Sequence, residues 1–266
     1  MDEQIITLYQ EGQSLAALSR EFGLSTYKIR QFLVNNNIHI RSKAEQAVFT
    51  NQQRAKSVDI NYFDNIDTPQ KAWILGFLAA DGTVDEDRNR IKIGLSTVDK
   101  EILEKIKAEI KIERKILDTE TNNGFSVSEL VWSNCNHKIQ LAKYGIVPKK
   151  TYKEMKVPDF TSDLQLAFIQ GFFDGDGCFK DDGQYCRWEV CAYRPEILQS
   201  IEQVIHKNFG FSKQVYKDKS RDNYYTLTYS TEEAWSILKR CYEICPLYLN
   251  RKMQKVILWA KRNQRI

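Results

Sequence analysis

One nine-residue segment occurs twice in this chain of 266 residues, first at positions 74–82 and again at positions 169–177. The first copy reads ILGFLAADG and the second reads IQGFFDGDG, so one offset, 95 residues from position 74 to position 169, relates them. The same offset carries the Glu-Ile-Leu segment at 101–103 onto the Glu-Ile-Leu segment at 196–198. We therefore expect two copies of one structural unit, each close to the size of a small domain.

Each copy is predicted to be the end of an apolar helix, because an Asp-Gly pair follows a run of apolar residues. Small residues recur four positions apart, at Gly76 and Ala80 in one copy and at Gly171 and Gly175 in the other, which places each pair on one helix face. A glycine inside a helix costs about 0.8–1 kcal/mol relative to alanine. We expect close contact between the two helix backbones to offset this cost. The last glycine of each copy is expected in the left-handed conformation that ends many helices.

Two helices that cross along these faces would bring Asp81 and Asp176 side by side. The carboxylates would repel each other, and each would lie at the negative end of a helix dipole. A divalent cation relieves both effects, and Mg²⁺ commonly takes one or two carboxylates together with phosphate oxygens. The sequence therefore predicts a metal site. Its ligands are Asp81 and Asp176, and the backbone of Gly82 or Ala80 and of Gly175 offers further candidates.

The repeated segment resembles the motif of the LAGLIDADG homing endonucleases, and both copies are present at the separation usual in that family. The eighth residue of the motif is the metal-binding acid of the family, which corresponds to Asp81 and Asp176 here. Ala79 departs from the motif, which has Asp at this position, whereas the second copy keeps Asp174. The resemblance implies a site-specific endonuclease for double-stranded DNA that uses Mg²⁺, for which Mn²⁺ can substitute.

The rest of each repeat is predicted to be α+β, because strands with alternating polarity follow each motif helix. In residues 66–157 we expect helices at 68–80, 99–110 and 134–144 and strands at 82–87, 90–97, 112–119 and 125–133. In residues 158–266 we expect helices at 162–175, 195–208 and 231–241, strands at 177–181, 185–192, 213–219 and 223–230, and a closing helix at 247–263. The resemblance implies that these two αββαββα repeats form a pseudo-symmetric saddle of antiparallel sheets on the DNA.

Residues 1–40 are predicted to form a small all-α domain with helices at 2–11, 15–22 and 26–34. Ser14 and Ser25 are expected N-caps, and Gly23 ends the second helix. A helix, a short turn with glycine and a second helix are typical of the helix-turn-helix. The segment SLAALSREFGLSTYKIRQFL resembles the resolvase/invertase-type DNA-binding domains. On the third helix we expect Ile29, Phe32 and Leu33 to pack inward and Thr26, Tyr27, Lys28, Arg30 and Gln31 to face DNA.

Residues 41–65 are polar and are predicted to be a linker with one helical stretch near 43–55. Arg41 and Lys43 are candidates for contact with the phosphate backbone, while a plain tether is the alternative. The net charge of the chain is only +4, but basic residues gather in 25–56, 143–156 and 251–266, which favours phosphate contacts. Further candidates for DNA contact lie on or beside the expected strands: Arg90, Lys92, Arg187, Lys213, Lys217, Lys219 and Arg221.

Basic residues follow each repeat, and the resemblance places one of them beside each metal-binding acid. Lys150 and Lys252 are the nearest matches, with Lys149 and Arg251 as alternates, because the repeat offset has drifted to 102 residues here. Such a lysine would orient the attacking water or neutralise charge on the phosphate; a simple phosphate contact is the alternative. The family also places a polar residue at the end of the second strand. Thr97 fits this description, whereas Ala192 stands at the corresponding position and cannot form a hydrogen bond.

Several other classes of function are disfavoured. No apolar run is long enough to span a membrane, and the acidic N-terminus argues against a signal peptide. The six cysteines lack CxxC pairs and are expected to be buried thiols in a reducing cytoplasm, bacterial or phage-encoded, with an organelle as the alternative. His137 and His206 are expected to be surface or packing residues. We expect a monomer, since both repeats are in one chain.

Two other functions remain open from the sequence. A transcription regulator would bind DNA without cutting it, although regulators with this fold lack the paired acids. An RNA maturase would bind the transcript of its host intron, and this activity is compatible with DNA cleavage.

Overall fold

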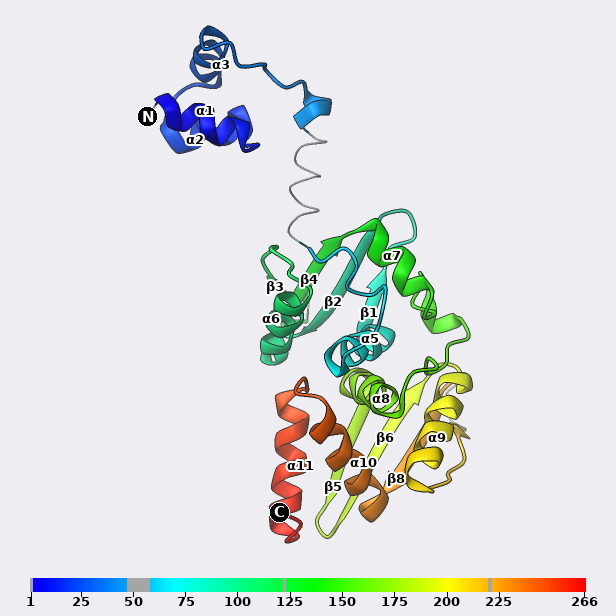
Figure 1. Cartoon of the computed structure of the whole chain (residues 1–266). Helices are drawn as coiled ribbons and strands as arrows, with labels where there is room; N and C mark the ends of the chain where they lie inside the picture. The colour runs from blue at the N-terminus through cyan, green and yellow to red at the C-terminus, as the bar shows by residue number, and fades with distance from the viewer. Residues whose placement is uncertain (1, 47–57, 122, 220–221) are drawn as a thin grey trace. The chain divides into compact units, whose positions relative to one another are not determined.

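The computed structural model describes residues 2–46, 58–121, 123–219 and 222–266 (Figure 1). The chain divides into two compact units, residues 1–59 and residues 60–266. Tyr62 and Phe63 are buried within the second unit, where the Phe63 amide donates to Gln140 Oε1. The ordered second unit therefore begins before residue 66. No helix among the described residues is both long enough and apolar enough to cross a membrane.

The N-terminal unit contains α1 (Asp2–Gln10), α2 (Leu15–Phe22) and α3 (Thr26–Asn35). Ser14 and Ser25 accept hydrogen bonds from backbone amides in the first turns of α2 and α3, and Gly23 has a φ of 66° at the end of α2. The three capping predictions are therefore confirmed. The core of this unit consists of Ile5, Tyr9, Leu18, Ile29 and Leu33, and Phe32 packs against it as a half-buried side chain.

Arg41 ties the end of the N-terminal unit to its first helix. Its guanidinium lies 3.9 Å from the centre of the Tyr9 ring, and Nη2 donates to the carbonyl oxygens of Tyr9 and Gln13, both at 2.8 Å. Its Nε donates to Gln46 Oε1. Arg41 is thus engaged in packing this unit together, and Lys43 is exposed. Of the helical stretch expected at 43–55, residues 43–46 are helical, and the remainder lies outside the described residues.

The second unit contains two similar α+β repeats, as predicted. The first has α5 (Pro69–Asp81), β1 (Gly82–Val84), β2 (Arg90–Ser96), a 3₁₀ turn (Thr97–Asp99), α6 (Lys100–Glu109), β3 (Leu117–Glu120), β4 (Ser126–Ser133) and α7 (Cys135–Ala142). A second 3₁₀ turn (Lys150–Tyr152) precedes the second repeat. That repeat has α8 (Ser162–Asp176), β5 (Gly177–Asp182), β6 (Tyr185–Ala192), α9 (Pro195–Phe209), β7 (Tyr216–Lys217), β8 (Tyr225–Ser230), α10 (Thr231–Ile244) and α11 (Asn250–Arg262).

Each repeat forms one four-stranded antiparallel sheet, in the order β1-β2-β4-β3 or β5-β6-β8-β7. The third strand of each repeat is shorter than predicted: β3 begins at Leu117 rather than near 112, and β7 covers only Tyr216–Lys217. Both strands lie at a sheet edge, and every residue of both is exposed. An edge strand with no buried face gains little from pairing, so its length cannot be inferred from hydrophobic alternation.

The motif helices α5 and α8 lie against each other with their backbones in contact. A Cβ atom on Gly76 would lie 2.0 Å from the carbonyl oxygen of Phe168, and one on Gly171 would lie 2.0 Å from the carbonyl oxygen of Trp73. Glycine is therefore required at both positions. The predicted contact along the small faces is confirmed, and it places the C-terminal ends of the two helices together.

The predicted left-handed conformation of the last motif glycines is wrong. Gly82 and Gly177 have φ angles of −72° and −94°, so each leads directly into an extended strand. A Cβ at Gly82 would lie 2.5 Å from the carbonyl oxygen of Leu78, and one at Gly177 would lie 2.5 Å from that of Phe173. These glycines are needed because the strand folds back against the last turn of its own helix.

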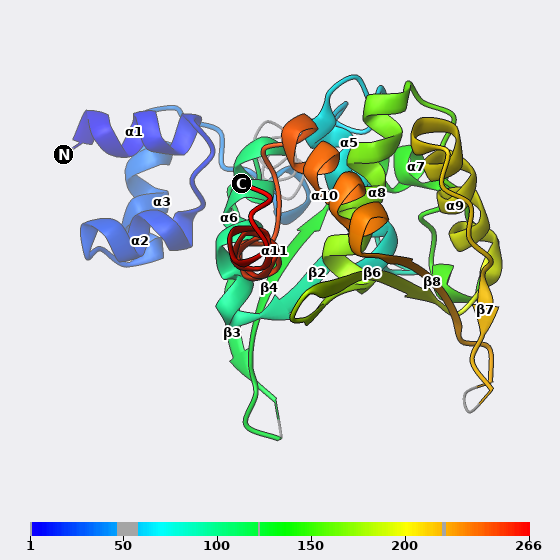
Figure 2. The ribbon, with the colours of Figure 1, turned by 90° about the horizontal axis from the view of Figure 1, so that it is seen from below.

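Each sheet packs one face against helices and leaves the other face open. On β2, Ile91 and Ile93 are buried while Arg90 is exposed, and on β6 Trp188 and Val190 are buried while Arg187 is exposed. Figure 2 shows the helices on one side of the two sheets, with the β3–β4 and β7–β8 hairpins reaching away from the helices. The open faces of both sheets therefore point to the same side of this unit.

Candidate active site

Asp81 and Asp176 are the last residues of α5 and α8, so the contact between these helices brings the two acids together. Asp81 is half-buried and Asp176 is exposed. Gly175 makes the approach possible, because a Cβ there would lie 3.3 Å from Asp81 Oδ2 and 2.4 Å from the Cβ of Ala80. The predicted pairing of the two acids is present in the structure.

Burial raises the pKa of both carboxyl groups. Desolvation raises the pKa of Asp176 to about 6, and the negative charge of Asp81 adds to this effect. Desolvation also raises the pKa of Asp81, while the positive charges of Lys252, Lys150 and Arg251 oppose the rise. Two acids that resist ionisation beside each other gain from a shared cation. Among the described residues no group of three or more His, Cys, Asp or Glu side chains could hold a metal, so a cation here would depend on this pair.

Lys150 and Lys252 each lie under the end of the motif helix in their own repeat. Lys150 Nζ donates to the carbonyl oxygens of Ala80 and Gly82, at 2.9 and 2.6 Å. These two oxygens, which the sequence offered as metal ligands, are thus bonded to an ammonium group. Two cations on one oxygen repel each other, so the carbonyl oxygens of Ala80 and Gly82 are disfavoured as metal ligands.

Lys252 is more deeply enclosed, with only 5% of its surface exposed. Its Nζ donates to the carbonyl oxygens of Phe173, Asp174 and Gly177 at 2.6, 2.8 and 2.6 Å, and the oxygen of Gly175 is 3.5 Å away. Burial lowers the pKa of Lys252 to about 8 and also lowers the pKa of Lys150. Three acceptors match the three hydrogens of the ammonium group, so Lys252 acts on the site by holding the backbone on both sides of Asp176.

Asp174, the sixth motif residue, is fully buried and joins the two repeats. Its Oδ2 accepts hydrogen bonds from Trp73 Nε1 on α5, at 3.0 Å, and from Gln170 Nε2, at 3.1 Å. Burial raises the pKa of Asp174 to about 7. Ala79 stands at the corresponding position of α5, so the first repeat lacks this connection.

One ion pair near the site was not predicted from the sequence. Arg251 Nε donates to Asp99 Oδ2 at 2.7 Å, and the side chain of Asp99 is only 5% exposed. The adjacent Asn250 donates to Glu101. The start of α11, at the end of the second repeat, is thereby bound to the first repeat. The motif offset gives no signal for this contact, because it carries Asp99 onto Arg194.

Thr97 lies in the 3₁₀ turn after β2, where its hydroxyl oxygen is 3.2 Å from Ser128 Oγ, and Ser128 also donates to Asp118. Ala192, at the corresponding end of β6, lines a small pocket of about 60 Å³ together with Lys150 and Asp176. The two histidines lie as expected: His137 is buried and accepts a hydrogen bond from Trp132 Nε1, and His206 is exposed.

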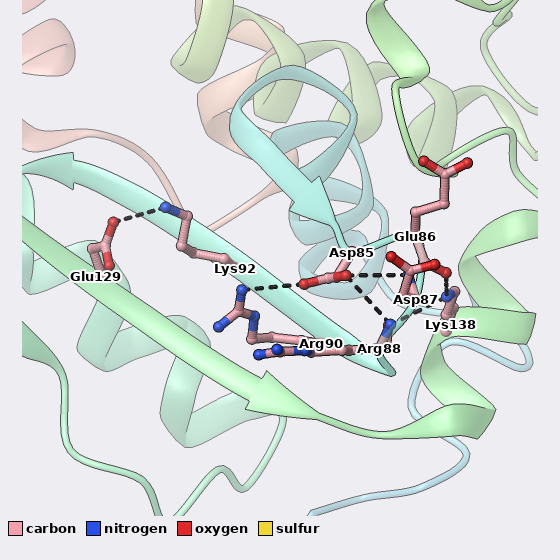
Figure 3. Close-up of polar contacts among 8 residues, drawn as sticks. All are labelled: Asp85, Glu86, Asp87, Arg88, Arg90, Lys92, Glu129 and Lys138. Carbon is pink, nitrogen blue, oxygen red and sulfur yellow. Dashed lines mark hydrogen bonds and ion pairs between the residues drawn. The ribbon is translucent and has the colours of Figure 1, made fainter.

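Most basic residues predicted to contact DNA from the sheets are paired with acids. Figure 3 shows Lys92 reaching Glu129 at 2.8 Å and Arg90 reaching Asp85 at 3.1 Å. These four side chains line a groove of about 660 Å³ on the open face of the first sheet. The other pairs are Arg187 with Asp182 and Lys213 with Glu233. Lys217 and Lys219 are exposed, and Arg221 lies outside the described residues.

The turn that presents Arg90 is held in place by backbone contacts. Asp85 Oδ1 accepts hydrogen bonds from the amides of Asp87 and Arg88, and Lys138 Nζ donates to the carbonyl oxygens of Glu86 and Arg88 (Figure 3). These contacts therefore hold in place the backbone that leads into Arg90.

The cysteines only partly match the expectation of buried thiols. All six are free, and Cys186, Cys241 and Cys245 are buried. Cys135 and Cys178 are exposed. A cysteine on the open side of a strand or at a helix start gives no sequence signal that separates it from a buried one.

Several known proteins are similar to this chain in sequence or structure. A protein of Methanocaldococcus jannaschii of unknown function is 27% identical over 161 residues, which cover 56% of this chain and 53% of that protein. This chain thus spans about half the length of that relative. Two solved structures are similar in fold: full-length DUF199/WhiA from Thermatoga maritima, with 15% identity and a TM-score of 0.49, and the I-LtrWI LAGLIDADG homing endonuclease bound to target DNA, with 14% identity and a TM-score of 0.48. The matches cover 78% and 77% of this chain and 65% and 92% of those chains, respectively.

A family model, the LAGLIDADG-like domain, matches residues 68–152 and 163–242. The two matched segments cover more than half of the chain, and each contains one motif helix with its acid. The chain belongs to the LAGLIDADG-like family.

Proposed function

We propose that this protein is a site-specific endonuclease that hydrolyses phosphodiester bonds of double-stranded DNA with the help of a divalent cation. The observation that carries the proposal is the pairing of Asp81 and Asp176 at the adjoining ends of α5 and α8. A chain that only bound DNA would gain nothing from two acids placed against a polyanion. Both acids are present although each has a raised pKa.

The donor set suits Mg²⁺. Two carboxylates with phosphate oxygens are typical ligands of this ion, and Gly175 leaves open the space beside Asp81 that a side chain would fill. Bound at Asp81 and Asp176, Mg²⁺ would lower the pKa of a water molecule and stabilise charge on the phosphate and the leaving oxygen. Mn²⁺ has similar ligand preferences and is expected to substitute.

The protein's own residues hold this arrangement in place. The ammonium groups of Lys150 and Lys252 bind the carbonyl oxygens around both acids, which fixes the carboxylates and offsets the negative ends of the two helix dipoles. In the reaction, a water oxygen attacks the phosphorus and one backbone P–O bond breaks. One water proton ends on the leaving oxygen. The positive charges of the two lysines favour the more negative transition state.

DNA binding would use both units of the chain. The open sheet faces carry Arg90, Lys92, Arg187, Lys213, Lys217 and Lys219, and Arg221 is a further candidate. The ion pairs of this set would open on binding, or their acids would accept hydrogen bonds from cytosine amino groups. On α3, Thr26, Tyr27, Lys28, Arg30 and Gln31 are exposed on one helix and fit the recognition helix of a helix-turn-helix. With both repeats in one chain, a monomer has a complete site.

The proposal is tested with a plasmid that carries the DNA flanking the open reading frame, joined as in an allele without the insertion. Wild-type protein with Mg²⁺ should linearise this plasmid, and Asp81→Asn and Asp176→Asn should each abolish double-strand cleavage. Thermal unfolding of both variants checks that they are folded. Linearisation that survives either substitution would reject the assigned site.

Binding measurements with the same DNA separate the two alternatives, a regulator and a maturase. Specific retardation of the duplex without cleavage in Mg²⁺ or Mn²⁺ would indicate a DNA-binding regulator. Tighter binding to the transcript of a surrounding intron than to the DNA would indicate a maturase, which can also cleave DNA.

A further inference from the structure

The open face of the first sheet carries three neighbouring apolar side chains. Leu117 on β3 is directly opposite Glu129 on β4, so it lies diagonally between Val127 and Val131. Leu117 is 54% exposed, and both valines are half-buried. Leu117, Val127 and Val131 are called the apolar strip below. Apolar side chains gathered on an open, otherwise polar face are typical of a surface that another molecule covers.

The neighbouring strand β2 leaves the apolar strip accessible. Gly94 is opposite Glu129, and a Cβ on Gly94 would lie 3.5 Å from Glu129 Oε1 and 4.0 Å from Val127 Cγ1. Because glycine has no side chain, β2 does not cover this part of β4. Leu117 and Val131 line the groove of about 660 Å³ on the same face.

The groove combines these apolar groups with charge. Arg90, Lys92 and Arg114 line it, and so does Thr83, which lies two residues after Asp81 and is opposite Lys92. The acids that line it are each paired: Asp85 with Arg90, Glu86 with Lys149 and Glu129 with Lys92. Arg114 therefore leaves the lining with an excess positive charge, which suits a polyanion. In the major groove of DNA, the methyl group of thymine is the apolar group that the base pairs present.

The second sheet has hydroxyl groups at two positions of the strip. When the two ladders are matched from the motif glycines onward, Thr228 takes the position of Val131, and Tyr216 takes the position of Leu117. Thr228 Oγ1 is 3.5 Å from Glu189 Oε2, and Tyr216 is exposed. The two open faces therefore offer different chemistry to a ligand, although their backbones are similar.

From these observations we propose that the apolar strip reads thymine methyl groups, so that the half of the DNA site under the first sheet contains A·T pairs recognised through those methyls. The other half is read through hydroxyl and charged groups of the second sheet. This inference rests on the part of the proposed function that makes double-stranded DNA the substrate, and it makes Leu117, Val127 and Val131 specificity-determining residues.

The test uses the full chain and a duplex selected by binding from a randomised library, in buffer without divalent cation. Each thymine of the duplex is replaced in turn by deoxyuridine, which keeps the base pair and the minor groove but lacks the methyl group. A thymine that the strip contacts should lose about three- to fourfold in affinity, as expected for one buried methyl. A preference for A·T pairs that arose only from DNA shape would survive this exchange.

Two variants identify the thymines that the strip contacts. Val131→Thr keeps the shape of the side chain and replaces a methyl by a hydroxyl, and Leu117→Ser changes an exposed residue at a sheet edge. Both should unfold at the wild-type temperature. In at least one of them, deoxyuridine at a contacted thymine should cost less than about twofold, because the methyl has already lost its partner. Those thymines should all lie on one side of the position that wild-type protein cuts with Mg²⁺.

Thr228→Val is the matched control, because it makes the reverse exchange at the equivalent position of the second sheet. It should leave the deoxyuridine effects in the first half of the site unchanged. Thymines read by the N-terminal unit should remain sensitive in all three variants.

Deoxyuridine effects of equal size in wild type, Val131→Thr and Leu117→Ser would overturn the inference, and so would a selected site without any sensitive thymine. Equal effects together with loss of self-association in Leu117→Ser would show that the strip binds a second copy of the chain instead. Cleavage is measured separately: a duplex with the predicted thymine response that is not cut in Mg²⁺ or Mn²⁺ would reject the endonuclease but keep the inference. If the library yields no bound duplex, both fail.

Discussion

Gly175 of α8 faces Asp81 of α5 so closely that a Cβ at position 175 would lie 3.3 Å from Asp81 Oδ2. The same Cβ would lie 2.4 Å from the Cβ of Ala80, a distance that real Cβ atoms do not show. The position of one acid of the proposed site is therefore set by a missing side chain on the opposite helix.

Gly175→Ala should therefore affect activity more than stability. The added methyl group must push the ends of α5 and α8 apart, which typically costs about 1–3 kcal/mol in a well-packed contact. We expect a folded protein with a lower midpoint of denaturant unfolding and a cleavage rate reduced by at least about tenfold, as expected when reacting groups move by about 1 Å. Gly94→Ala is a stability control, because a Cβ there meets only side-chain atoms at ordinary contact distance, of Glu129 at 3.5 Å and of Val127 at 4.0 Å. A wild-type cleavage rate in Gly175→Ala would contradict this account of the site.

Gly76 and Gly171, in the middle of the helix contact, should tolerate substitution by alanine less well than Gly175 does. A Cβ on Gly76 or Gly171 would lie 2.0 Å from a backbone carbonyl oxygen of the opposite helix, and backbone cannot turn aside as a side chain can. Gly76→Ala and Gly171→Ala should each lower the free energy of unfolding by more than Gly175→Ala does, as measured by denaturant unfolding. If either variant were as stable as wild type, the close packing of α5 against α8 would be wrong.

Asp174 and Trp73 form a second link between the repeats. Asp174→Ala leaves Trp73 Nε1 and Gln170 without their shared acceptor in a buried place, which should lower the free energy of unfolding by about 1–3 kcal/mol. Asp174→Asn keeps an acceptor oxygen and should be milder. The midpoint of thermal unfolding should be highest for wild type, lower for Asp174→Asn and lowest for Asp174→Ala. Equal stability of wild type and Asp174→Ala would show that this link contributes nothing.

Removing residues 1–57 should leave the chemistry intact, because residues 60–266 form a compact unit with both acids. The cut keeps Ile60, whose carbonyl oxygen accepts from Gln140, and the buried Phe63. Duplex affinity should fall, and the slope of log affinity against log salt should shrink by about 0.9 for each phosphate that the shortened protein no longer neutralises. The footprint should shorten on one side only, since the N-terminal unit occurs once. An unchanged footprint would mean that this unit binds a partner other than DNA.

The parts of the fold that a local pattern determines were predictable. The repeated small residues predicted the contact of α5 with α8. Ser14 and Gly23 predicted the bounds of α2, and Ser25 predicted the start of α3, because each signal is local in the sequence. The left-handed conformation expected for Gly82 was wrong, since the strand folds back on its own helix and this approach is not visible in the sequence.

The tertiary contacts of charged residues could not be predicted from the sequence either. Nothing near Lys252 in the sequence shows that it binds three carbonyl oxygens of α8 and β5. The pairing of Asp99 with Arg251 joins residues from different repeats and breaks the repeat symmetry. Such pairs depend on how the repeats pack, so periodicity and the motif offset cannot predict them.

The most direct test of the central claim is to expose a randomised duplex library to the protein in Mg²⁺ and to sequence the ends produced. The account predicts ends at one long, defined site, with paired breaks on both strands, and no such ends when Asp81→Asn and Asp176→Asn are combined. Enrichment of a bound site without any cut ends, or the same ends from the double variant, would contradict it.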